Sequence, residues 1–112
     1  MLSGFDMVNE EDYNLKIDDF LEVIYSAKLK HGERFNVIMH AGESYARTNT
    51  EMFDAVLLGS KRIGHGFNLI MHPNLIEVIK EKQICLECCP ISNKVLGYVQ
   101  DLRLHPVRSL LQ

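Results

Sequence analysis

The sequence predicts an α/β fold that forms part of a (β/α)8 barrel of the TIM type. Short apolar runs typical of strands alternate with longer segments of helical periodicity, and this order indicates consecutive βα units of a parallel sheet. A complete barrel needs about 250 residues, whereas this chain has 112. We therefore expect about four consecutive βα units, with the barrel truncated at both ends.

Four apolar runs carry the strand prediction. Each is short, contains β-branched or aromatic side chains, and is followed by glycine, proline or polar residues that end a strand. The expected strands are residues 4–8, 35–40, 62–65 and 84–89.

Segments of helical spacing separate these strands. The first, residues 17–29, repeats apolar side chains at helical intervals and precedes Gly32, a plausible stop. The second follows Thr48-Asn49-Thr50-Glu51, where we expect a capping box, in which the Thr48 hydroxyl and the Glu51 carboxylate each satisfy a free backbone amide. A third helix is expected at residues 74–82, and residues 105–111 resemble the start of another.

A doubly wound sheet of four or five strands also fits the length. Such sheets typically place a glycine-rich turn after the first strand, and no such turn follows Val8. We therefore favour the barrel segment.

Composition and charge exclude several classes of partner. Hydrophobic residues make up 46% of the chain and charged residues 24%, an ordinary globular mixture for one domain or part of one. A net charge of −3 without a block of Lys or Arg argues against a nucleic-acid partner. No apolar run approaches the roughly 20 residues that span a bilayer.

Side chains suited to catalysis follow three of the expected strands. His40 and Glu43 follow the second strand, His65 ends the third, and Cys89-Pro90-Ile91-Ser92-Asn93 follows the fourth. In β/α barrels the carboxyl ends of the strands carry the active site, because the loops converge there over a rigid base. We expect His40, Glu43 and His65 to converge on one pocket.

Two interpretations of these residues remain open. His40 and Glu43 suit a metal ligand beside a proton donor, but they equally suit a core histidine and a solvated loop carboxylate. His65 lies between Gly64 and Gly66, which lets a ligand approach the imidazole closely. The same sequence also fits a tight turn with an uninvolved histidine.

The remaining cysteines and histidines receive structural interpretations. Cys85 and Cys88 lie three apart, so a strand turns their side chains to opposite faces. With an odd number of cysteines we expect buried thiols without a catalytic role. His31, His72 and His105 are expected to be caps or surface residues.

Three linked motifs resemble the adenosine deaminase family. They are residues 40–43 (HAGE), 62–66 (RIGHG) and 89–93 (CPISN), in this order and near this spacing. Residues 4–8 and 101–107 extend the resemblance to its secreted branch, the adenosine deaminase-related growth factors. The resemblance covers almost the whole chain.

The resemblance implies a zinc-dependent barrel of the metal-dependent hydrolases. Its reaction is the hydrolytic deamination of adenosine or deoxyadenosine to inosine or deoxyinosine, with release of ammonia. His40 matches a zinc ligand, Glu43 matches the acid that protonates the purine ring nitrogen, and His65 matches the histidine that orients or deprotonates the zinc-activated water. Bound Zn²⁺ lowers the pKa of water to about 7.

Asn9, Glu11, Gly42 and Glu43 are the substrate-binding residues that the resemblance implies. The family has glycine in place of Asn9, where the backbone lies against the purine. The family's first strand also supplies a His-x-His pair of zinc ligands, and its last supplies adjacent aspartates. Neither a His-x-His pair nor a strand ending in adjacent aspartates occurs here, so we expect residues 1–112 to be the central part of a catalytic domain, inactive when isolated.

Alternatives to this hypothesis stay open. They are another metal-dependent deaminase of the same barrel class, such as a nucleotide deaminase, and a catalytically inactive, growth-factor-like paralogue that binds a partner or nucleoside. The expected partner is a small-molecule nucleoside, and the resemblance adds a homodimeric full-length protein secreted to the extracellular space. The first residues lack the regions of a signal peptide, so without the resemblance we expect a cytoplasmic chain.

Overall fold

A parallel sheet of four strands in the order β1-β2-β3-β4 forms the centre of the computed structural model, which describes residues 4–111. Each strand pairs with the next strand along the chain, as consecutive βα units require. The strands are β1 (Phe5–Met7), β2 (Val37–Ala41), β3 (Arg62–His65) and β4 (Cys85–Glu87).

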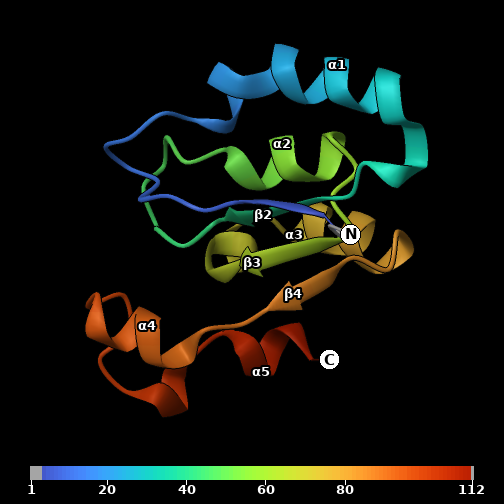
Figure 1. Ribbon diagram of the computed structural model, residues 1–112. Helices are drawn as coiled ribbons and strands as arrows, with labels where there is room; N and C mark the ends of the chain where they lie inside the picture. Colours follow the sequence, from blue (N-terminus) through green and yellow to red (C-terminus); the bar gives the residue numbers. More distant parts are fainter. Residues whose placement is uncertain (1–3, 112) are drawn as a thin grey trace.

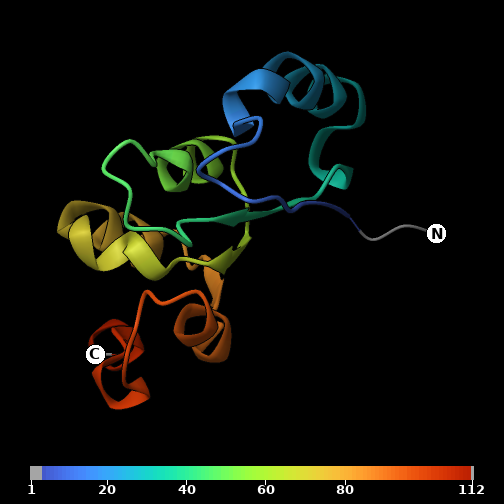
Figure 2. The ribbon, with the colours of Figure 1, turned by 90° about the vertical axis from the view of Figure 1, so that its left-hand side faces the viewer.

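Helices connect the strands and gather on one side of the curved sheet. In Figure 1, α1 and α2 lie above the strands, and α4 and α5 lie below β4. Figure 2 shows the helices of the described residues following one another around one side of the sheet, while the opposite side is open. The α-helices are α1 (Leu21–His31), α2 (Glu51–Leu57), α3 (Pro73–Glu81), α4 (Pro90–Val95) and α5 (Val107–Leu110), and the 3₁₀ helices are η1 (Ile17–Phe20), η2 (Gly32–Arg34), η3 (Phe67–Met71) and η4 (Leu102–Leu104).

The hydrophobic core lies between the sheet and the helices. Successive side chains of a strand point to opposite faces, and in β2 this buries Val37, Met39 and Ala41. Met39 is paired in register with Ile63 of β3, and both are fully buried. The helices complete the core with Ile24 of α1, Met52, Ala55 and Val56 of α2, and Leu75 and Ile79 of α3.

The other face of the sheet carries polar side chains. His40 is paired in register with Gly64, and Gly64 with Glu87. Glu87 forms an ion pair with Arg62, whose side chain is 56% exposed. His40 lies near the carboxyl end of β2, the end of the strands that carries the active site in β/α barrels.

The observed elements differ from the expected ones mainly near β4. Strand β3 has the expected bounds, 62–65, whereas β4 covers only Cys85–Glu87 of the expected 84–89. Helix α4 was not predicted. It has six residues and begins with Pro90 in its first turn, so its sequence is too short to show helical periodicity, and the proline ends the strand pairing before it.

The predicted capping box at α2 is wrong. The helix begins at Glu51, and the side chain of its N-cap residue, Thr50, makes no capping hydrogen bond. Instead Asn49 Oδ1 accepts a hydrogen bond from the Glu51 amide at 3.2 Å. The Glu51 carboxylate accepts the Ile17 amide at 3.1 Å, because it is turned toward η1 rather than back along its own helix.

Two side-chain environments also need correction. Cys85 is exposed and Cys88 and Cys89 are half-buried, because β4 is short and Cys85 is paired with Arg62 on the open face. His105 is 4% exposed, so it is not a surface residue. It does act as a cap, since its Nδ1 accepts the Val107 amide at 3.1 Å.

No helix within residues 4–111 combines the length and apolar character needed to cross a membrane.

Candidate active site

The carboxyl ends of β2 and β3 bring His40, Glu43 and His65 together. The imidazole rings of His40 and His65 lie 5.3 Å apart between centroids, edge to face at 64°. The Glu43 carboxylate approaches from the loop after β2, with Oε1 3.3 Å from His65 Nδ1. A positive φ of 70° at His65, followed by 60° at Gly66, turns the chain sharply at the end of β3.

Gly64 makes the space in which the His40 ring lies. A Cβ at this position would stand 2.5 Å from His40 Cδ2 and 2.7 Å from Nε2. Because these distances are too short for a carbon atom, only glycine fits here without a shift of the ring. On its other side His40 Nδ1 lies 3.1 Å from Asp6 Oδ1. An Nδ1–H that donates to this carboxylate leaves the lone pair of Nε2 for a ligand.

Glu11 holds the loop that carries Glu43. Its two carboxylate oxygens accept the Glu43 amide at 3.1 and 3.0 Å, and Asn49 Nδ2 donates to the same group. Glu11 is 5% exposed, and burial raises its pKa above the ordinary 4.5, an effect that these hydrogen bonds oppose. All these contacts of the Glu11 carboxylate are within the protein. Sequence reasoning assigned Glu11 to substrate binding and missed its part in fixing the loop.

Ser92 reaches Glu43 from the other side. Its hydroxyl, at the start of α4, donates to Glu43 Oε1 at 3.0 Å. Sequence reasoning gave Ser92 no role of its own, although its place in the motif after β4 was a signal.

The surroundings of His65 favour its neutral form. Burial lowers its pKa below the ordinary 6.5, the Glu43 carboxylate acts against this, and the neighbouring His40 adds to it. The buried Nδ1 makes no hydrogen bond within the described chain, since its approach to Glu43 lacks the required alignment. A neutral imidazole with an unsatisfied nitrogen is able to accept a proton.

Asn9 and Gly42 occupy two different places. Asn9 is exposed and borders a cavity of about 330 Å³, whose lining also includes Asp6, Glu11 and His40 but neither Glu43 nor His65. Gly42 has a φ of 73°, and a Cβ there would stand 2.5 Å from Asn68 Oδ1. Gly42 therefore packs closely inside the protein and turns the chain between β2 and Glu43.

The fit to a metal is partial. His40, oriented by a carboxylate and with Nε2 free, has the surroundings of a metal-binding histidine. Residues 4–111 nevertheless contain no group of three or more His, Cys, Asp or Glu able to hold a metal ion. A catalytic zinc needs three protein ligands, so these residues account for one of them.

Comparisons with known proteins find similar sequences. Residues 1–112 match the family model described as adenosine deaminase. Over 112 residues the chain is 45% identical to adenosine deaminase of Aedes albopictus and 41% identical to adenosine deaminase 2 of Dictyostelium discoideum, and over 114 residues it is 40% identical to adenosine deaminase 2 of Homo sapiens. These alignments cover 97%, 96% and 99% of the chain but only 20%, 20% and 22% of the relatives.

A solved structure shows the same architecture. Adenine deaminase from Arthrobacter aurescens superposes with a TM-score of 0.82 at 25% identity, over 98% of this chain and 32% of that one. This likeness and the parallel sheet with its helices confirm the predicted fold, a partial (β/α)8 barrel. The chain spans about a fifth of the length of the curated relatives that it matches.

Proposed function

The chain belongs to the adenosine deaminase family, and from this premise we propose that residues 1–112 are the central βα units of a catalytic domain that deaminates adenosine or deoxyadenosine. Water replaces the amino group of the purine, and inosine or deoxyinosine and ammonia are released. The observation that supports this proposal most directly is the meeting of His40, Glu43 and His65 at adjacent strand ends.

His40 is the residue of this chain that would hold the zinc ion. Its Nε2 is the free nitrogen, and Asp6 orients the ring through Nδ1. When bound, zinc supplies the Lewis acidity that makes water nucleophilic at neutral pH. The other ligands belong to the complete barrel, in the His-x-His pair of the first strand and the aspartates of the last.

Glu43 and His65 carry out the proton transfers. Glu43 donates a proton to the purine ring nitrogen as water adds to the amino-bearing carbon. His65, held neutral by burial, orients the attacking water and accepts its proton. Both groups are shielded, with side-chain exposures of 18% and 12%, which strengthens their electrostatic interactions with a bound substrate.

Substrate binding falls to the loops around these groups. Gly42 and Glu43 lie on the loop after β2, and Asn9 lies on the loop after β1 beside the cavity that His40 borders. Glu11 contributes by holding the Glu43 amide in place. We extend the family resemblance to a secreted, homodimeric complete protein that acts on nucleosides.

The test is an assay of the complete protein that carries residues 1–112, with inosine and ammonia both measured. Wild-type protein is expected to convert adenosine, and Glu43→Gln is expected to lower kcat by about 10²- to 10⁴-fold, the usual contribution of a general acid. Glu81→Gln, at an exposed position on α3, is the matched control and should leave kcat unchanged.

Other outcomes would reject the proposal. Deamination of adenosine monophosphate without activity on the nucleoside would indicate a nucleotide deaminase. Tight binding of adenosine without turnover would indicate an inactive paralogue. A Glu43→Gln variant as active as wild type would remove Glu43 from the mechanism.

A further inference from the structure

We infer that Ser92 is a positioning residue for the Glu43 carboxyl group, an inference that rests on the proposed function. The Ser92 hydroxyl donates to Glu43 Oε1 at 3.0 Å, across 49 residues of sequence. Serine in the first turn of a helix usually bonds a nearby backbone amide. In α4 it instead joins the helix to the loop after β2.

Ser92 and His65 approach the same oxygen of Glu43. Oε1 receives the hydroxyl of Ser92 at 3.0 Å and lies 3.3 Å from His65 Nδ1, and residues 4–111 provide no hydrogen bond to Oε2. Because Ser92 holds Oε1 as an acceptor, Oε2 is left free to carry the proton of the neutral carboxyl group. Ser92 thus selects the oxygen that donates its proton to the substrate.

The short helix α4 is fixed firmly enough to perform this task. Asn93, next to Ser92, is fully buried, and its Oδ1 accepts a hydrogen bond from His105 Nε2 at 3.0 Å. The backbone carbonyl of Asn93 accepts the Tyr98 and Val99 amides at 2.9 and 3.2 Å. These bonds tie the helix to the segments that follow it in the chain.

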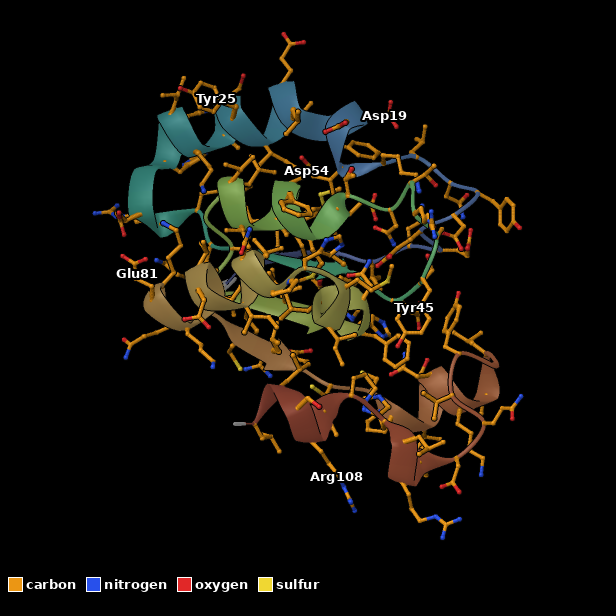
Figure 3. All side chains as sticks on the ribbon, turned by 180° about the vertical axis from the view of Figure 1, so that it is seen from behind. Asp19, Tyr25, Tyr45, Asp54, Glu81 and Arg108 are labelled. Carbon is orange, nitrogen blue, oxygen red and sulfur yellow. The ribbon has the colours of Figure 1, made fainter. Side chains whose placement is uncertain are left out.

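Aromatic contacts join the same two segments. Tyr45, two residues after Glu43, lies where the loop after β2 faces the α4 segment (Figure 3), with its ring centroid 6.4 Å from that of Tyr98. Phe67 packs against Tyr45 at 4.5 Å and against His105 at 5.2 Å. The relative position of Ser92 and Glu43 is therefore set by packing around both, and the hydroxyl needs no rearrangement to meet the carboxylate.

The kinetic test compares three variants of the complete protein that carries residues 1–112. Ser92→Ala is expected to lower kcat for adenosine by about tenfold with little change in KM, which corresponds to losing one hydrogen bond to a neutral carboxyl group. Ser92→Thr keeps the hydroxyl and should retain kcat within about threefold. Ser109→Ala, an exposed serine on α5, should match wild type.

A second measurement separates this inference from the proposed reaction. In ¹⁵N-histidine-labelled residues 1–112, the chemical shift of His65 Nδ1 should change in Ser92→Ala, because Glu43 moves, and return in Ser92→Thr. An unchanged kcat in Ser92→Ala overturns the positioning role. So does an equal fall of kcat in Ser92→Ala and Ser92→Thr that is matched by an equal fall in the amount of folded protein. If the NMR pattern holds but the wild-type protein does not deaminate adenosine, the Ser92 contact stands and the reaction is rejected.

Discussion

Replacing Gly64 by alanine tests the geometry of the site most sharply, because the His40 ring occupies the space that the added methyl group would need. The added Cβ would lie 2.5 Å from His40 Cδ2, so the ring must move by about 0.9 Å to reach an ordinary contact of 3.4 Å. Gly64 is not among the residues with positive φ. The substitution therefore acts through this contact and not through backbone strain.

The displacement predicts a loss of both stability and function. Overpacking of this kind costs about 1–3 kcal/mol of unfolding free energy. Because Gly64 lies on β3 and Asp6 on β1, the added Cβ pushes the His40 ring toward β1 and disturbs the 3.1 Å contact between His40 Nδ1 and Asp6 Oδ1. A misplacement near 1 Å lowers activity by about 10²-fold. Zinc content should fall with it, because His40, the proposed zinc ligand, is the residue that moves.

The assay measures kcat/KM for adenosine and bound zinc in the complete protein, and urea unfolding in residues 1–112. Gly97→Ala is the control: Gly97 has a φ of 82° and no atom within 4 Å of its added Cβ. It should cost about 1 kcal/mol through backbone strain alone and leave zinc binding intact. A Gly64→Ala protein with normal zinc content and activity would refute the assignment of the His40 ring to the site.

Three further predictions concern the residues that support the site and the fold. Glu11→Gln places an amide group opposite the Glu43 and Asn49 donors and should lower the unfolding free energy by about 1–3 kcal/mol. An unchanged urea midpoint would show that the hydrogen bonds to Glu11 are dispensable. Asn49→Ala should lower the unfolding free energy by about 1–2 kcal/mol and Thr48→Ala by less than about 0.5 kcal/mol. The reverse order would indicate that Thr48 caps the helix after all. Burial lowers the pKa of His105 below 6.5, so the folded state binds fewer protons there than the unfolded state, and its contribution to stability is lost as pH falls below 6.5. The difference in unfolding free energy between wild type and His105→Gln should therefore be smaller at pH 5 than at pH 7.5, and an equal difference would contradict this.

The strands and the strand-end residues could be predicted from sequence because their signals are local. Strand β3 is the clearest example, since it has the predicted bounds, Arg62–His65, and pairs with β2, the strand before it in the chain. Parallel strands align their carboxyl ends, so His40 and His65 necessarily approach each other once the strand order is known.

The supporting contacts could not be predicted, because they join residues far apart in the chain. Glu11 reads as part of an acidic turn until the loop after β2 folds over it, and Ser92 reads as a helix-start serine until α4 meets Glu43. The burial of His105 likewise depends on Asn93 and Phe67, which come from two other segments.

The most direct test of the account is to measure inosine formation and zinc content together in the complete protein that carries residues 1–112, for wild type and for His40→Ala. The account predicts that wild type binds zinc and releases inosine and ammonia in equal amounts, and that His40→Ala loses both the metal and the activity. Inosine formation that persists in His40→Ala, or a zinc-loaded wild-type protein that leaves adenosine unchanged, would contradict it.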